Sequence, residues 1–189
     1  MKEINTPEEL LSFMKENINY GYLGKEGKIY YKEDKDFDSK WYNEYILETP
    51  NQVLNNLCGN CFDQVEFERE WFEKHNYEVK TIFEIVKLEY KNDYPTHSYL
   101  VYKDKNNKWN WFENADFINR GIHTFNEFEE LIDYEYKKYL EILKTLNITE
   151  EEKSRIVMTE FGKPREKISA EEYLNHALSS KIIRGKIDE

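Results

Sequence analysis

The sequence predicts an α+β fold in which helices come first, an antiparallel sheet lies in the middle of the chain, and helices follow it. Helix-start signals followed by helical apolar spacing mark both ends of the chain. Runs of strand-like composition separated by turn residues occupy the middle. The chain has 189 residues, with 15 Tyr and 11 Phe to bury, which suits one domain with a real core.

The N-terminal flank, residues 1–48, is expected to contain a helix and a short strand. Thr6–Glu9 supplies an N-cap, a proline in the first turn and acidic residues for the helix dipole. An apolar helical face follows, made of Leu10, Leu11, Phe13, Met14 and Ile18. Three glycines then interrupt the pattern, and a strand is expected at 28–31. Residues 32–40 are expected to form a charged loop. Residues 41–47 are apolar enough to pack against the core, but their pattern does not specify the type of secondary structure.

The core, residues 49–146, is expected to begin with two helices. Thr49 opens a short helix that ends at Leu57, and a turn follows. A second helix starts at Cys61 and ends near His75, with apolar residues at helical spacing.

Three strands and a long helix complete the predicted core. The strands are expected at 79–88, 98–102 and 108–112, with Asp104–Asn107 as the hairpin turn between the last two. Thr124–Glu127 is expected to start the amphipathic helix, which reaches about Leu146.

The C-terminal segment, residues 147–189, is expected to be a helical extension of the same domain. Thr149–Glu152 forms a capping box, and Ser169–Glu172 caps the last helix. Gly162–Pro164 is a loop between them.

The charge and the apolar pattern exclude several partners. The net charge is −11, whereas binding nucleic acid requires a basic surface. The acidity is compatible with a cationic substrate, although it also serves solubility. No secretory signal and no apolar run of roughly 20 residues is present, so we expect a cytoplasmic protein with no membrane partner. Its two cysteines are then expected to be reduced.

A thiol, an imidazole and a carboxylate occur in settings that aim them at one another. Cys61 begins a helix, where the dipole and free N–H groups favour a thiolate and can hold an oxyanion. His97 begins one strand and Glu113 ends its hairpin partner. These positions lie at the same end of the hairpin, so Glu113 is expected to orient the imidazole.

Three motifs together resemble the transglutaminase-like branch of the papain-like cysteine enzymes. Gly59–Gln64 is similar to the Gly-x-Cys turn of that family, and Thr96–Tyr102 to its His-led strand. Lys108–Glu113 is similar to its Lys-Trp strand, which ends in an acidic residue. The resemblance covers roughly residues 50–116. It implies an antiparallel sheet packed against the helix that bears the nucleophile.

The resemblance also implies the roles of the catalytic residues. Cys61 is the nucleophile, His97 the base and Glu113 the residue that orients it. The family usually has Asp at the third place, so Asn114 and Asp116 remain alternatives to Glu113.

Four further residues are candidates for binding the substrate or its oxyanion. In the papain branch an amide side chain ahead of the cysteine helps to hold the oxyanion, which suggests Asn55, with Gln52 behind it. Trp41 and Trp111 are candidate binding residues; Trp111 shares a strand face with Trp109 and is either core or cleft wall.

The reaction implied by the resemblance is acyl transfer or amide hydrolysis through a thioester on Cys61. The substrate would be a peptide or protein amide, with no cofactor and no metal. Water as acceptor would give a peptidase or deamidase, and an amine would give a cross-linking enzyme. The acceptor and the oligomeric state stay open.

Two alternatives belong to other functional classes. Cys58-x-x-Cys61, with Tyr94–Thr96 before a strand, is similar to the thioredoxin pattern and would indicate a redox protein. That motif should directly follow a buried strand, whereas here a short polar helix precedes it. The other alternative is a catalytically inactive peptide-binding module on the same fold.

Overall fold

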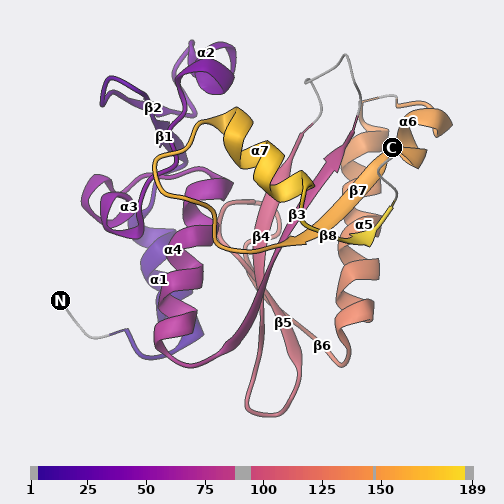
Figure 1. Ribbon diagram of the computed structural model, residues 1–189. Helices are drawn as coiled ribbons and strands as arrows, with labels where there is room; N and C mark the ends of the chain where they lie inside the picture. Colours follow the sequence, from indigo (N-terminus) through magenta and orange to yellow (C-terminus); the bar gives the residue numbers. More distant parts are fainter. Residues whose placement is uncertain (1–3, 88–94, 147, 186–189) are drawn as a thin grey trace.

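A six-stranded antiparallel sheet forms the centre of the computed structural model, which describes residues 4–87, 95–146 and 148–185 (Figure 1). The strand order is β6-β5-β4-β3-β7-β8. Their bounds are β3 (Glu78–Val86), β4 (His97–Lys103), β5 (Trp109–Glu113), β6 (Gly121–Phe125), β7 (Ile156–Phe161) and β8 (Lys181–Arg184). The fold is therefore α+β, as the sequence predicts.

Helices cover both faces of the sheet (Figure 1). They are α1 (Pro7–Asn17), α2 (Phe37–Glu44), α3 (Pro50–Asn56), α4 (Cys61–Lys74), α5 (Phe128–Lys144), α6 (Glu150–Ser154) and α7 (Ala170–Leu178). A small antiparallel ladder of β1 (Gly21–Leu23) and β2 (Ile29–Tyr31) lies near α2.

Alternation along the central strands separates two apolar layers. Leu100 and Phe112 belong to the core shared with α1, α4 and α7. Val101 and Trp111, one step along each strand, belong to the core shared with α5. Successive strand side chains point to opposite faces, so each buried strand must be apolar on both sides.

The predicted helix starts are confirmed at four caps. The side chain of Thr6 accepts a hydrogen bond from the backbone of Glu9, and Thr49, Thr149 and Ser169 each form a complete capping box. These local signals specify α1, α3, α6 and α7 because the cap satisfies N–H groups that the helix itself cannot.

The prediction of a purely helical C-terminal segment is wrong. β7 lies between β3 and β8, and Val157, Met158 and Thr159 on it are fully buried. A short segment that is buried on both sides has no apolar periodicity that distinguishes a strand from a helix. Residues 156–161 form a strand because they pair with β3.

Two further local predictions are corrected, and a strand without a prediction is added. The start of α2 at Phe37 interrupts the loop expected at 32–40, and β1 was not expected at all. The long helix begins at Phe128, because Gly121–Phe125 pairs with β5 as β6. Tertiary pairing overrides the local helix-start signal at Thr124. Residue 88, at the end of the strand expected at 79–88, and Tyr94 of the thioredoxin-like pattern lie outside the described residues.

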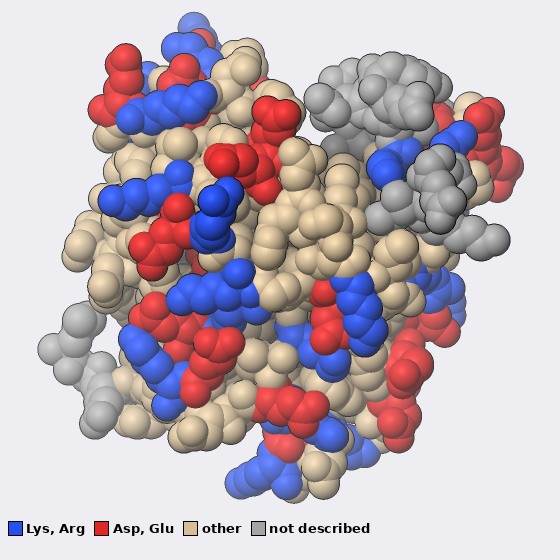
Figure 2. Space-filling view, in the orientation of Figure 1, with Lys and Arg blue, Asp and Glu red and all other residues tan. Residues whose placement is uncertain are grey.

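Charged side chains of both signs are interspersed over the face shown in Figure 2. Such mixing is typical of a solvated surface. In the described part of the chain, no helix has the length and apolar character needed to span a bilayer.

Candidate active site

The N-terminus of α4 holds Cys61 in a rigid turn. The side-chain oxygen of Asn60 accepts hydrogen bonds from the backbone N–H groups of Phe62 (2.9 Å) and Asp63 (3.3 Å). The carboxylate of Asp63 accepts one in return from the N–H of Asn60 (3.0 Å). A Cβ at Gly59 would lie 2.9 Å from the Cβ of Asp63, so the turn requires glycine there. Cys61, the first residue of the helix, is therefore fixed in position.

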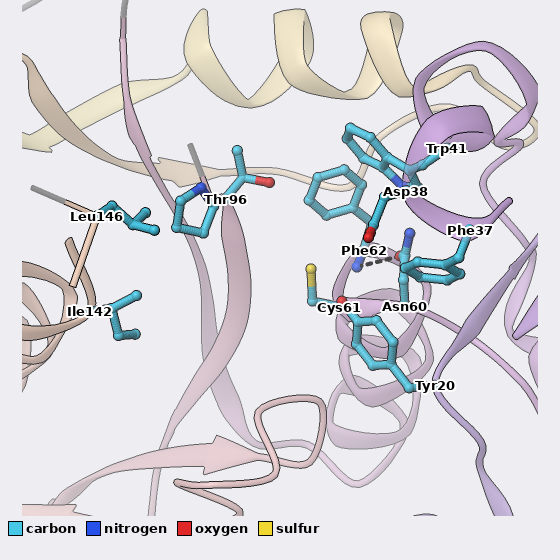
Figure 3. A pocket seen from close by; sticks show the side chains of 11 residues that line it. Tyr20, Phe37, Asp38, Trp41, Asn60, Cys61, Phe62, Thr96, Ile142 and Leu146 are labelled. Atoms are coloured by element: carbon cyan, nitrogen blue, oxygen red, sulfur yellow. Dashed lines mark hydrogen bonds between the residues drawn. The ribbon is translucent and has the colours of Figure 1, made fainter. Parts of the chain in front are cut away.

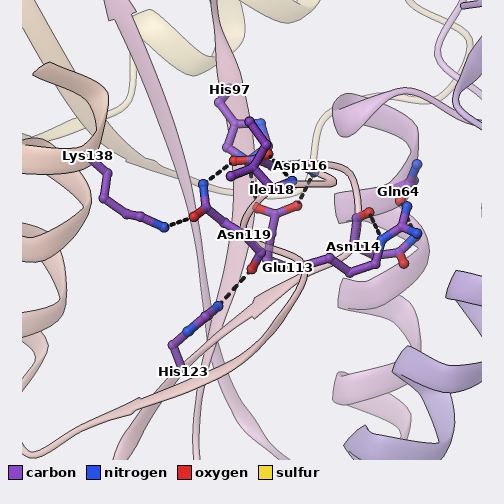
Figure 4. A network of polar contacts seen from close by, with 10 residues as sticks. Gln64, His97, Glu113, Asn114, Asp116, Ile118, Asn119, His123 and Lys138 are labelled. Carbon is purple, nitrogen blue, oxygen red and sulfur yellow. Dashed lines mark hydrogen bonds and ion pairs between the residues drawn. The ribbon is translucent and has the colours of Figure 1, made fainter. Parts of the chain in front are cut away.

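A buried amide pair ties this turn to the end of β5. Gln64 donates to the carbonyl oxygen of Gly59 (2.7 Å) and accepts from the side chain of Asn114 (2.7 Å). Figure 4 shows Asn114 directed toward Gln64. Asn114 thus connects β5 to α4, and its amide is not the partner of the His97 ring.

His97 and Glu113 form a direct pair at the same end of the β4–β5 hairpin. Nε2 of His97 lies 2.7 Å from Oε2 of Glu113. In this hairpin Leu100 faces Phe112. The next step of the same register sets Glu113 opposite Tyr99, which makes His97 its diagonal neighbour. A long side chain can span a diagonal of this kind, and a glutamate has one methylene more than an aspartate.

The second carboxylate oxygen of Glu113 accepts a hydrogen bond from the backbone N–H of Asp116 (2.7 Å). The side chain of Asp116 itself turns to its own loop, where it accepts from Ile118 and Asn119. Of the three candidates for the acidic partner, Glu113 is therefore the one that contacts the ring (Figure 4).

The charge state of His97 depends on its two neighbours. Burial lowers its pKa, but the negative charge of Glu113 and a hydrogen bond with the Cys61 side chain raise it, and the net pKa is well above the usual value. The Glu113 side chain is only 2% exposed, so water screens this interaction weakly. His97 thus interacts with Cys61 as well as with Glu113.

Three more buried carboxyl groups surround this pair. Burial raises the pKa of Glu84 to about 8, that of Glu135 to about 9, and that of Glu68 well above its ordinary value. Glu84 faces His97 across the β3–β4 ladder. Both printed values lie above neutral pH, so Glu84 and Glu135 favour the protonated form there.

Tyr20 is a site residue that the sequence analysis missed. Its hydroxyl points toward Cys61 in Figure 3. Burial raises the pKa of Tyr20 well above its usual value, and the neighbouring Cys61 raises it further, while a hydrogen bond with the Cys61 backbone acts in the opposite direction. Tyr20 lies between α1 and β1, and no sequence motif links it to Cys61.

Cys61 opens into a cavity of about 650 Å³ (Figure 3). The cavity is lined by Tyr20, Phe37, Asp38, Trp41, Asn60, Cys61, Phe62, Pro95, Thr96, Ile142 and Leu146. Trp41, predicted as a binding residue, is thus part of its wall.

The other predicted binding residues lie elsewhere. Asn55 is exposed on α3, away from the cavity lining, and Gln52 forms the capping box of that helix with Thr49. Trp111 is 1% exposed in the core beneath α5. Asn55 and Gln52 were wrong as oxyanion candidates because spacing before the cysteine does not specify which way a helix faces.

Cys58 and Cys61 are both buried, but only Cys61 lines the cavity. Both cysteines are free, but Cys58 is completely buried, and burial raises the pKa of its thiol to about 12. The motif follows helix α3 rather than a strand. This setting disfavours the exchange chemistry that a reactive Cys-x-x-Cys pair performs.

Among the residues that the structure describes, no group of three or more His, Cys, Asp or Glu side chains is arranged to hold a metal ion.

Comparison with protein families, with curated proteins and with solved structures gives no match. The chemistry of the site itself therefore carries the functional argument.

Proposed function

We propose that this chain is a cysteine-dependent acyl-transfer or amide-hydrolysing enzyme of transglutaminase-like type. The observation that carries the proposal is the contact between His97 and the buried Glu113, next to a cysteine that starts a helix and faces a cavity. A nucleophile, a base and a residue that orients the base are the parts that thiol catalysis requires.

The pairing of His97 assigns its two ring nitrogens to different tasks. Nε2 is engaged by Glu113, which leaves Nδ1 for the thiol. In the first step the Cys61 proton moves to Nδ1, and the thiolate attacks the amide carbonyl carbon. The carbonyl π electrons move to oxygen and form an oxyanion.

The helix start and Tyr20 are suited to stabilise that oxyanion. The backbone N–H of Cys61 lies at the first turn of α4 and forms a hydrogen bond with Tyr20, so this N–H and the Tyr20 hydroxyl are two neighbouring donors for an oxyanion beside Cys61. The raised pKa of Tyr20 keeps its proton available for donation.

The intermediate then collapses to a thioester on Cys61. The carbon–nitrogen bond breaks, and His97 transfers its proton to the leaving amine. Water or a second amine next attacks the thioester with His97 as base, which releases the acyl product and restores the thiolate and imidazolium.

The proposal is tested by iodoacetamide labelling as a function of pH, with mass spectrometry to identify the labelled sulfur. We expect Cys61 to be labelled well below pH 8.5, about the ordinary thiol pKa, and Cys61→Ala to abolish the low-pH labelling. Cys58→Ser is the matched control and should label as the unmodified chain does.

Labelling of Cys61 that rises only near pH 8.5 would contradict the proposed ion pair with His97. It would favour the alternative in which the aromatic cavity binds a peptide without chemistry. Redox activity that Cys58→Ser abolishes would favour the thioredoxin-like alternative.

A further inference from the structure

The cavity beside Cys61 has two chemically different halves. On the α5 side it is aliphatic, with Ile142 and Leu146 exposed by 43% and 47%. On the α2 side it is lined by aromatic rings and one carboxylate, Asp38. Figure 3 shows Cys61 between the two halves.

Aromatic packing holds the α2 half in shape. The ring centroids of Tyr20 and Phe37 are 6.1 Å apart, and those of Trp41 and Phe62 are 5.8 Å apart. Phe62 directly follows Cys61 in α4, so this wall adjoins the thiol.

Asp38 is the charged member of this wall. In Figure 3 it lies between the rings of Trp41 and Phe37. Within the described part of the chain its carboxylate has no hydrogen bond or ion pair, whereas nearby Asp36 pairs with Lys40 at 3.0 Å. Asp38 is therefore available to a ligand.

Aromatic faces attract cations, and the Tyr20 ring of this wall already has a lysine ammonium group near it. Nζ of Lys32 lies 5.4 Å from the centroid of the Tyr20 ring, although Lys32 is not part of the cavity lining. Rings combined with an acid form the arrangement that recognises ammonium and guanidinium groups. The net charge of −11 further favours a cationic ligand.

We propose that the α2 half of the cavity is a subsite for a cationic side chain of the substrate, held by Asp38 between the rings of Phe37 and Trp41. The statement that this ligand is a substrate rests on the proposed function. The binding itself does not.

The test uses Cys61→Ala protein, which cannot form a thioester. N-acetyl-lysine methylamide and N-acetyl-norleucine methylamide are titrated separately, and the indole N–H resonance of Trp41 is followed by NMR after assignment with Trp41→Phe. The lysine probe should shift this resonance saturably and bind about tenfold more tightly than its neutral analogue. An arginine probe should behave as lysine does.

Asp38→Asn should remove the preference for the lysine probe. Glu33→Gln removes the same charge from an exposed position outside the cavity and should leave the preference intact. Equal binding of the two probes, no shift of the Trp41 resonance, or equal effects of the two substitutions would overturn the proposal. A positive titration combined with unreactive Cys61 would reject the enzyme but keep the subsite.

Discussion

The carboxylate of Glu113 controls the charge of His97. Burial by itself lowers the pKa of the imidazole, and the negative charge of Glu113 reverses that effect. The pairing also explains why a glutamate serves here: the hairpin register makes His97 a diagonal neighbour, and the longer side chain reaches it.

Glu113→Gln should lower the pKa of His97 by about 1 to 3 pH units, because an opposite charge this close is lost. The His97 imidazolium would then lose its proton at a lower pH. Any activity that requires the protonated ring would therefore decline at a lower pH in the variant than in the unmodified protein. NMR titration of the His97 ring measures the pKa directly.

Asp116→Asn is the control for this titration, since it removes a charge from the same loop but keeps the Glu113 contact. An unchanged His97 pKa in Glu113→Gln, or an equal fall in both variants, would show that Glu113 is not the controlling charge.

The cap at the start of helix α4 both stabilises the folded protein and holds Cys61 in position. Asn60 and Asp63 form a capping box that is buried, unlike the solvent-accessible cap at Ser169 on α7. Both caps supply acceptors to N–H groups at a helix start, but only the cap at Asn60 adjoins Cys61.

Asn60→Ala should lower the free energy of unfolding by about 1 to 3 kcal/mol, because two buried N–H groups lose their acceptor. It should also slow the labelling of Cys61 at low pH, since the turn that holds the thiol loosens. Urea denaturation and the labelling rate measure the two effects.

Ser169→Ala removes a comparable cap and is expected to cost about 1 kcal/mol without changing Cys61 labelling. If both variants altered labelling alike, the effect would reflect general destabilisation rather than the turn at Cys61.

The buried acids around the site couple the stability of the protein to pH. Glu84 has a pKa raised to about 8 in the folded protein, against an ordinary value of 4.5. Between these values the unfolded chain releases the proton and the folded protein keeps it. Stability contributed by this retained proton is therefore present at low pH and is lost as pH rises toward 8.

Glu84→Gln should remove this loss, because the amide is neutral at every pH. Relative to the unmodified protein, its free energy of unfolding should rise by on the order of 1 kcal/mol per pH unit between pH 4.5 and 8. Urea denaturation across that range measures the slope.

Glu141→Gln on the exposed side of α5 is the control and should show no such slope. A pH-independent difference between Glu84→Gln and the unmodified protein would mean that Glu84 is charged in the folded state.

The sequence alone predicts those features whose interactions lie within a few residues of one another, such as helix caps and hairpin turns. Thr6, Thr49 and Ser169 specify helix starts because the hydrogen bonds of a cap lie within one turn. The turn at Asp104–Asn107 sets the register of one hairpin, and that register leads from Glu113 to His97. The contact between these two side chains could therefore be predicted from the sequence.

Features that depend on distant partners emerged only in the folded chain. β7 became a strand because β3 offers it an edge, and Tyr20 and Asp38 line the cavity because α2 and the segment after α1 pack beside α4. Asn55 had suitable chemistry at a suitable spacing and still faces solvent. Burial and side-chain direction arise from contacts between segments far apart in sequence, and no local pattern encodes them.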